Sequence, residues 1–391
     1  MAKKPSKQPC PTSDGASGNV EHGRCSQNNN RESRCGSQNN GRLSVRFSAD
    51  STLSDSGHGH LSPYATPSAT REVLERHGLY TKYALGQNFL VNDDIVRKII
   101  ELADVQPTDH VLEVGPGIGT LTSALLQKAG HVTSIEMDHD LPTVLQDTLA
   151  PWLGCFTLLE MDALDLREEH LQRAMGVACD DGSASKGTVP KDDWEDSHLS
   201  QNDCLQSSMG AVPSDSFPLP NKLVSNLPYA VAATIVLDYL QRFPFLQSAT
   251  VMVQKEVADR MQAEAGTKDY GSLSLAVQYY SHPHVEVEVP PRSFMPRPKV
   301  SSSVISLDIY ETPPVKVEDE ELFRNIVRAA FSQRRKTLVN ALGNAALLSF
   351  SKEQVAAALK DLGLPETIRG EVLSLEQFAA LANRLGQETG R

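Results

Sequence analysis

The stretch that decides the fold is His110–Leu126, which reads HVLEVGPGIGTLTSALL. The apolar, β-branched run before Gly115 predicts a strand, and the leucines after Gly119 at helical spacing predict a helix. Glycines between the two allow a sharp backbone turn and the close approach of a ligand. A strand, a glycine-rich turn and a helix in this order are typical of the first unit of a nucleotide-binding α/β sheet.

The next predicted strand, His131–Ile135, ends in Glu136, about 20 residues beyond the glycines, where an acidic side chain binds both hydroxyls of a ribose. The ribose belongs to NAD, FAD or S-adenosylmethionine. Glu113 in the motif and Pro116 between the glycines favour S-adenosylmethionine, because a dinucleotide site uses G-x-G-x-x-G to hold a pyrophosphate. The sequence therefore predicts an S-adenosylmethionine site at this turn.

A third predicted strand, Phe156–Leu159, leads to Asp162. An acid at the carboxyl end of a parallel strand is well placed to accept a hydrogen bond from the adenine amino group of a bound nucleoside. A solvated turn aspartate explains the same position equally well.

The tetrapeptide Asn226-Leu227-Pro228-Tyr229 follows a fourth predicted strand and resembles the catalytic loop of enzymes that methylate the exocyclic nitrogen of adenine. The N6 lone pair is delocalised into the ring, so the amine is a poor nucleophile. The side-chain carbonyl of Asn226 and the main-chain carbonyl of Leu227 can each accept an N6–H bond and stabilise the charge that develops during attack. Pro228 fixes the turn, and Tyr229 offers a face for an extruded base. A plain turn with Tyr229 in the core is the alternative.

Composition divides the 391-residue chain into three parts. Residues 1–70 are rich in Ser, Asn and Gly, and we expect a disordered extension whose basic residues contact RNA weakly, if at all. Residues 71–311 are predicted to form a Rossmann-like α/β sheet of class I S-adenosylmethionine-dependent methyltransferase type, interrupted by an acidic low-complexity insertion at 174–219. Residues 312–391 are predicted to form a small α-helical domain that contacts RNA or the ribosome.

The net charge of −12 argues against a nucleic-acid binder, but the charge is unevenly distributed. The segment from Arg173 to Pro220 holds three Lys or Arg against eight Asp or Glu, a net of −5. Elsewhere basic residues cluster, above all Arg334, Arg335 and Lys336, which we expect on a helical turn in contact with RNA phosphates. A solvated helix face is the alternative.

Other classes of protein are disfavoured by composition. No apolar run approaches the roughly 18 residues of a membrane span, and the N-terminus lacks a secretory apolar region. The six cysteines form no C-x-x-C pair and are interpreted as reduced thiols, without a metal site or disulfide framework. We therefore expect a cytoplasmic protein with no membrane partner and no metal.

From about Tyr83 to Leu385 the chain resembles the small-subunit ribosomal RNA adenine dimethyltransferases of KsgA type. The resemblance rests on seven motifs: LGQNFL at 85–90, EVGPG at 113–117, NLPY at 226–229, QKEV at 254–257, YGxLS at 270–274, PKV at 298–300 and FSQRRKT at 331–337.

The resemblance implies further contacts and a substrate. In that family the QNFL loop closes over the cofactor, which implies that Asn88 and Leu90 contact S-adenosylmethionine. It also places around the cofactor Gly115, Glu136, Asp162 and Asn226. Its members methylate two adjacent adenines near the 3′ end of small-subunit rRNA, each twice, on an assembling subunit. The sequence leaves the oligomeric state open, and we expect a monomer.

Three other functions share parts of this pattern. A large-subunit rRNA methyltransferase of the antibiotic-resistance type is disfavoured by the long helical C-terminal part. A ribosome-assembly or transcription accessory factor would have dispensable catalysis, against which the intact Gly115, Glu136, Asn226 and Tyr229 argue. A DNA adenine methyltransferase would use the same tetrapeptide and is separated by methylation of naked duplex DNA.

Overall fold

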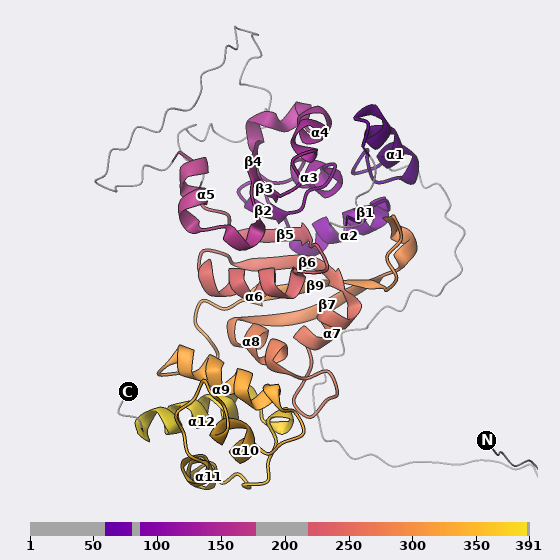
Figure 1. Ribbon diagram of the computed structural model, residues 1–391. Helices are drawn as coiled ribbons and strands as arrows, with labels where there is room; N and C mark the ends of the chain where they lie inside the picture. The colour runs from indigo at the N-terminus through magenta and orange to yellow at the C-terminus, as the bar shows by residue number, and fades with distance from the viewer. Residues whose placement is uncertain (1–58, 80–86, 177–217, 389–391) are drawn as a thin grey trace, which may run out of the picture. The chain divides into compact units, whose positions relative to one another are not determined.

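The computed structural model describes residues 59–79, 87–176 and 218–388. Within them lies a seven-stranded sheet with the strand order β4-β3-β2-β5-β6-β9-β7 (Figure 1). Strands β4, β3, β2, β5 and β6 run parallel, and β9 is antiparallel to both of its neighbours. In chain order the strands are β2 (His110–Val114), β3 (His131–Glu136), β4 (Phe156–Glu160), β5 (Lys222–Asn226), β6 (Ser248–Gln254), β7 (Ser281–Val289) and β9 (Ser302–Ile309).

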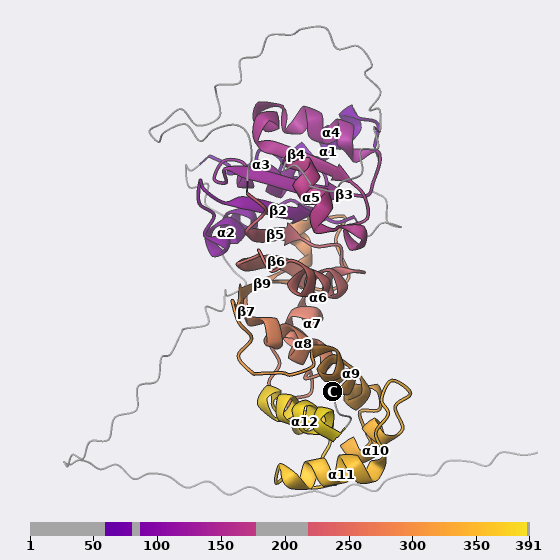
Figure 2. The same cartoon turned by 90° about the vertical axis from the view of Figure 1, so that its left-hand side faces the viewer.

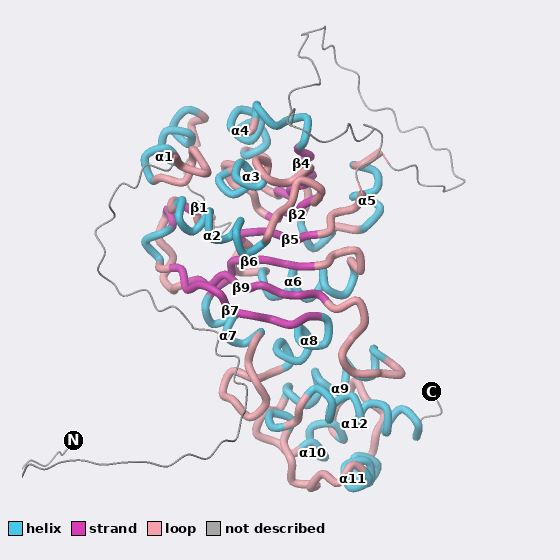
Figure 3. Tube along the Cα trace, turned by 180° about the vertical axis from the view of Figure 1, so that it is seen from behind, coloured by secondary structure: helices cyan, strands magenta, loops and turns pink. Residues whose placement is uncertain are grey.

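The sheet is covered on both faces, because apolar side chains alternate between two cores along each strand. Leu112 and Leu223 pack into one core, whereas Val111 and Val224 pack into the other. Figure 3 shows the sheet from behind with its helices. The second core receives α2 (Asp93–Ala103), α3 (Thr120–Leu125) and α4 (Leu141–Thr148); the first receives α5 (Glu168–Ala174), α6 (Ala232–Arg242), α7 (Lys255–Met261) and α8 (Ser272–Tyr280).

The strand order reverses between β2 and β5, which is where open α/β sheets bind their ligands. The ladder between these strands pairs Val111 with Lys222 and Leu112 with Leu223. Nearer the carboxyl ends of β2 and β5, the side chain of Ser225 connects the two strands. The Ser225 hydroxyl donates to the Val114 carbonyl over 2.6 Å and accepts from the Val114 N–H over 3.2 Å. The strand order thus predicts the site at this edge.

The predicted start of the folded part at residue 71 is wrong. Helix α1 spans Pro67–Arg76, and Ser62 before it is fully buried. The N–H groups of Leu61 and Ser62 donate to the Asp93 carboxylate over 3.0 and 2.8 Å. These contacts are hydrogen bonds between polar groups, and a single cap begins the helix. Neither feature gives a periodic apolar pattern in the sequence.

The extension up to residue 58 and the insertion from 177 to 217 lie outside the described residues, so the structure leaves their predicted disorder untested. Helix α5 ends at Ala174, where the insertion was predicted to begin. In the described part of the chain no helix is long and apolar enough to cross a membrane.

The C-terminal region is helical, as predicted. It comprises α9 (Glu320–Ser332), α10 (Leu338–Gly343), α11 (Lys352–Asp361) and α12 (Leu375–Glu388). Its core is not separate from the sheet, because α8 contributes to both: Leu273 and Val277 pack toward the sheet, whereas Leu275 and Tyr279 pack into the helical core. Figures 1 and 2 both show α8 next to α9. Residue 312 therefore separates two parts of the sequence, but it does not separate two independently packed cores.

Candidate active site

The glycine turn after β2 has a backbone that side chains rarely adopt. Gly115, Gly117 and Gly119 have φ values of +70°, +60° and +85°. A Cβ on Gly115 would lie 3.5 Å from Pro228, and one on Gly117 would lie 3.1 Å from the ring of Phe89. The turn is therefore in close contact with both the Asn-Leu-Pro-Tyr loop and strand β1 (Phe89–Leu90).

Glu113 lies just before the turn and is fully buried. Its Oε2 accepts hydrogen bonds from the hydroxyls of Thr122 on α3 and Ser134 on β3, each over 2.7 Å. Burial raises the pKa of the Glu113 carboxyl to about 7. The side chain ties three elements together beneath the turn, a role that spacing alone did not reveal.

Glu136, the predicted ribose ligand, lies at the end of β3 and is 8% exposed. Its Oε1 accepts the N–H groups of Met137 and Asp138 over 3.0 and 2.9 Å, and the N–H of Gly117 also bonds to the carboxylate. Burial raises the pKa of this carboxyl, and the Asp138 charge raises it further. The carboxylate is therefore held beside the glycine turn by main-chain donors.

Two neighbours of Glu136 were not predicted. Met137 is 54% exposed, which is unusual for a large apolar side chain. Asp138 is buried and accepts the side-chain amide of Gln87 over 2.7 Å. Gln87 belongs to the loop that precedes β1, so this bond connects that loop to the end of β3. The sequence signal for this part of the site is the apolar Met137 directly after Glu136, the acidic residue that ends the strand.

Asp162 is exposed and begins the short 3₁₀ helix Ala163–Asp165. Its Oδ1 accepts the N–H of Leu164 over 2.9 Å. One oxygen of the Asp162 carboxylate therefore caps the turn, as expected for a solvated turn aspartate. Contact with adenine stays a prediction for Asp162.

Asn226 is the last residue of β5, and the two ends of its side-chain amide differ in their contacts. Its Nδ2 donates to the main-chain carbonyl of Asn88 over 3.3 Å, whereas its buried Oδ1 has no hydrogen-bond partner among the residues that the structure describes. A buried polar group without a partner costs about 1–3 kcal/mol, which a bound N–H donor would offset. The N–H of Leu227 donates to the carbonyl of Met252 over 3.1 Å and anchors the loop to β6.

The next two residues of the loop are also held in place. The carbonyl of Pro228 accepts the N–H of Val231 over 3.2 Å. The Tyr229 hydroxyl lies 2.5 Å from Oγ of Ser302 on β9, and its ring meets Phe294 edge-on with centroids 6.4 Å apart. Burial raises the pKa of Tyr229. The side chain is half-buried and oriented from two sides, so Tyr229 is not a plain core residue.

The two residues implied by family resemblance differ in position. Asn88 lies beside Asn226 through its carbonyl. The Leu90 side chain is buried in the core beneath α2 and α3, in the strand that pairs with Phe294–Met295. Leu90 therefore has mainly its main chain to offer a ligand.

The basic cluster is not on a helix, contrary to prediction, because α9 ends at Ser332. Arg334 pairs with Glu371 over 3.2 Å and also donates to the carbonyls of Lys268 and Tyr270. Its guanidinium joins the turn to the rest of the protein, and contact of Arg334 with RNA stays a prediction. Arg335 and Lys336 are exposed, and no ion pair of theirs is seen within residues 59–79, 87–176 and 218–388.

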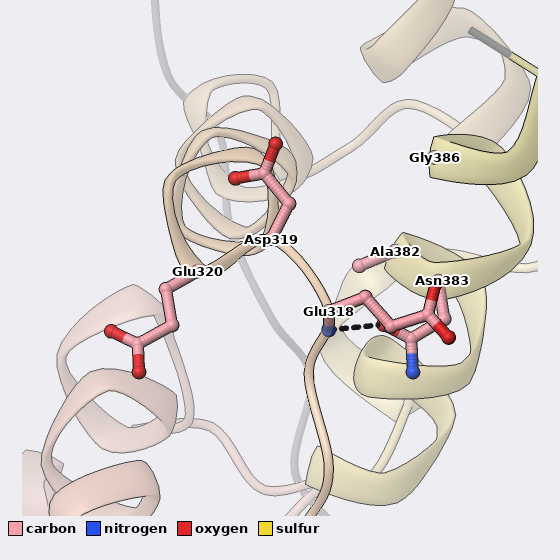
Figure 4. Close-up of a pocket in the computed structure, with 6 residues that line it drawn as sticks. All are labelled: Glu318, Asp319, Glu320, Ala382, Asn383 and Gly386. Atoms are coloured by element: carbon pink, nitrogen blue, oxygen red, sulfur yellow. Dashed lines mark hydrogen bonds between the residues drawn. The ribbon is translucent and has the colours of Figure 1, made fainter. Parts of the chain in front are cut away.

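An acidic pocket of about 400 Å³ lies elsewhere, between the start of α9 and α12 (Figure 4). The Glu318 N–H donates to Oδ1 of Asn383 over 2.9 Å. Asp319 caps α9 by accepting the N–H of Leu322 over 2.9 Å. These groups stabilise a helix N-terminus, which explains their charge without a ligand.

The family model "Ribosomal RNA adenine dimethylase" matches residues 79–387. The "Ribosomal RNA small subunit methyltransferase A" of Lachnoclostridium phytofermentans is 39% identical over 323 residues, which are 82% of this chain and 97% of that protein. The protein of the same name from Geobacillus kaustophilus is 38% identical over 331 residues, covering 84% and 98%.

Two solved structures share the fold. A dimethyladenosine transferase from Plasmodium falciparum aligns with a TM-score of 0.54 and 24% identity, over 75% of this chain and 95% of that one. The 23S rRNA methyltransferase ErmE aligns with a TM-score of 0.50 and 24% identity, over 77% and 100%. The predicted Rossmann-like methyltransferase fold is confirmed.

Proposed function

The chain belongs to the ribosomal RNA adenine dimethylase family, and from this premise we propose that it dimethylates the exocyclic N6 of two adjacent adenines near the 3′ end of small-subunit rRNA, with S-adenosylmethionine as methyl donor. The observation that carries the proposal is the buried Oδ1 of Asn226, which has no partner among the described residues, in a loop packed against the glycine turn. A carbonyl in this position is an acceptor for an amine proton.

The residues at the carboxyl edge of the sheet fit S-adenosylmethionine. Glu136 is held for the ribose by main-chain donors, and Gly115 and Gly117 let the turn pack closely against Pro228 and Phe89. We assign further cofactor contacts to Asn88, Asp162 and the main chain of Leu90. When bound, S-adenosylmethionine supplies an electrophilic methyl group on a sulfonium. Glu113, beneath the turn, holds the elements that shape this site.

The loop residues act on the adenine. Oδ1 of Asn226 and the carbonyl of Leu227 accept the two N6–H bonds, which directs the nitrogen lone pair out of the ring plane and stabilises its positive charge. Tyr229 stacks on the extruded base, a contact worth about 1–3 kcal/mol. The proton leaves the nitrogen for solvent after methyl transfer, so no buried base is required. The same geometry serves the second methyl group, because one N6–H remains after the first.

The substrate is proposed to be the rRNA of an assembling small subunit, in the cytoplasm, with the protein acting as a monomer. Two exposed cations, Arg335 and Lys336, support RNA contact next to α9. Arg334 supports it indirectly, because it holds the turn that carries them.

Transfer of tritium from labelled S-adenosylmethionine to small subunits from a strain without this modification tests the proposal. Wild type should label the subunits, Asn226→Ala should not, and both should bind the cofactor. Naked duplex DNA and large subunits serve as control substrates. Cofactor binding without any label would favour an assembly factor with dispensable catalysis, and label in DNA or large subunits would favour the other enzymes.

A further inference from the structure

The two residues that precede β1 join the end of β3 to the Asn-Leu-Pro-Tyr loop. The side-chain amide of Gln87 donates to Oδ2 of Asp138 over 2.7 Å, although the two residues are 51 positions apart in the sequence. The carbonyl of the next residue, Asn88, accepts Nδ2 of Asn226 over 3.3 Å, from 138 positions away. Hydrogen bonds on adjacent residues therefore connect the carboxyl end of β3 with the carboxamide that faces the proposed adenine site.

Asp138 is 6% exposed, and its polar groups have different roles. Its N–H donates to Oε1 of Glu136 over 2.9 Å, and its Oδ1 accepts the N–H of Asp140 over 3.2 Å. Its carbonyl accepts the N–H of Leu141, at the start of α4, over 3.1 Å. These three bonds are local and stabilise the turn after β3. The bond from Gln87 to Oδ2 is different, because it reaches a distant segment of the chain.

The Asn88 carbonyl is held from both sides along the chain. After Asn88, β1 pairs with β8 (Phe294–Met295), and the N–H of Val91 donates to the carbonyl of Ser293 over 2.8 Å. Before Asn88, the bond between Gln87 and the carboxylate holds the chain. A hydrogen bond to a charged acceptor is shorter and stronger than one between neutral groups. Loss of the Gln87 bond would therefore release the Asn88 carbonyl on one side.

We propose that Asp138 is a positioning residue for methyl transfer. It holds Gln87, and with it the Asn88 carbonyl that binds the carboxamide of Asn226. A carboxamide has one donor end and one acceptor end, so a carbonyl that holds Nδ2 also determines the direction of Oδ1. With the amide reversed, Nδ2 would present a donor to the N–H groups of the adenine amine. The inference rests on the proposed function, because that function gives Oδ1 of Asn226 its role.

Reversal of the hydrogen bond between Gln87 and Asp138 tests the inference. In Gln87→Glu a second carboxylate faces Asp138, so the bond is lost. In the double variant Gln87→Glu/Asp138→Asn, the carbonyl at position 138 still accepts the N–H of Asp140, and the NH2 group donates to the carboxylate at position 87. At saturating S-adenosylmethionine and small subunits, we expect kcat of Gln87→Glu to fall on the order of tenfold and to recover to within about twofold of wild type in the double variant.

Gln106→Glu is the matched control, because Gln106 donates to Oδ1 of Asp104 over 2.8 Å at the surface between α2 and β2. It places the same charge against an aspartate far from the site in sequence and should leave kcat unchanged. Gln87→Ala removes the amide without adding a charge and should lower kcat like Gln87→Glu. The Tm of each variant shows that it is folded.

A second measurement does not require methylation. The side-chain NH2 resonances of Asn226 in 15N NMR spectra, identified by their absence from Asn226→Ala, report the bond from Nδ2 to the Asn88 carbonyl. In protein without RNA they should shift in Gln87→Glu and return toward the wild-type positions in the double variant Gln87→Glu/Asp138→Asn.

The outcomes separate the positioning role from the proposed function. A wild-type kcat in Gln87→Glu, or a loss that the double variant does not recover, would overturn the inference. Unchanged Asn226 resonances in Gln87→Glu would also overturn it, because the effect would then not pass through Asn226. Resonances that shift in Gln87→Glu and are restored in the double variant, together with a wild type that transfers no methyl group, would support the contact and contradict the proposed function.

Discussion

Gly117→Ala is the substitution for which the structure predicts the sharpest separation of stability from cofactor binding. The residue has a φ of +60°, so alanine is strained by about 1–2 kcal/mol at this position. Its Cβ would also lie 3.1 Å from the Phe89 ring, closer than ordinary van der Waals contact. Phe89 must then move, and with it the neighbouring Asn88, whose carbonyl holds Asn226.

Two measurements follow from this reasoning. We expect Tm to fall by about 2–5 °C, from the backbone strain. We expect the affinity for S-adenosylmethionine, measured by isothermal titration calorimetry, to fall on the order of tenfold, or about 1.4 kcal/mol, because the shift of Phe89 displaces the proposed cofactor contact Asn88.

Gly363→Ala is the matched control. Gly363 has a φ of +69°, and a Cβ there would meet nothing within 4 Å. This variant should lose a similar amount of stability and bind the cofactor like wild type. Wild-type affinity in Gly117→Ala, or an equal loss of affinity in both variants, would refute the steric argument.

Three further predictions concern other contacts. Tyr229→Phe and Ser302→Ala remove the same hydrogen bond, so each should lower kcat/KM by about fivefold, and the double variant should lose no more than either single variant; additive losses in steady-state kinetics would show that the two hydroxyls act independently. Arg334→Gln should lower Tm, whereas Arg335→Gln should weaken binding to small subunits and leave Tm unchanged, because of these two side chains only that of Arg334 has partners among the described residues; the reverse pattern would contradict the assignment. Burial raises the pKa of Glu113 to about 7 in the folded protein, so the stability that this group contributes at acid pH is lost as pH rises from about 4.5 to 7. Glu113→Gln should therefore gain stability relative to wild type between pH 4 and pH 8, by at most about 3 kcal/mol in denaturant titrations. A stability difference that does not depend on pH would refute the raised pKa.

Much of the fold was predictable because its strands carry strong local signals. The buried run before Gly115 leads into glycines with positive φ, and the strand before Asn226 leads into Pro228, whose ring fixes φ. Sequence spacing does not predict that the glycine turn, the tetrapeptide and β1 lie close together. Their proximity depends on long-range contacts such as the hydrogen bond between Asn226 and Asn88. The placement of β9 between β6 and β7 is likewise a property of the sheet and not of the strand.

The errors have physical causes as well. The sequence pattern predicts a folded part that begins too late, because the hydrogen bonds from Leu61 and Ser62 to Asp93 give no hydrophobic pattern. Charge alone does not distinguish Arg334 from its two neighbours, although its guanidinium also donates to main-chain carbonyls. The importance of Ser302 depends on one contact across the sheet, which local sequence does not encode.

The central claim is that Asn226 presents its free carbonyl to an adenine amine of small-subunit rRNA. Mass spectrometry of nucleosides from subunits that lack the modification, after incubation with S-adenosylmethionine and enzyme, tests it most directly. The account predicts two dimethyladenosines per subunit with wild type and none with Asn226→Ala, although that variant still binds S-adenosylmethionine. Dimethyladenosine formed at the wild-type rate by Asn226→Ala would contradict it.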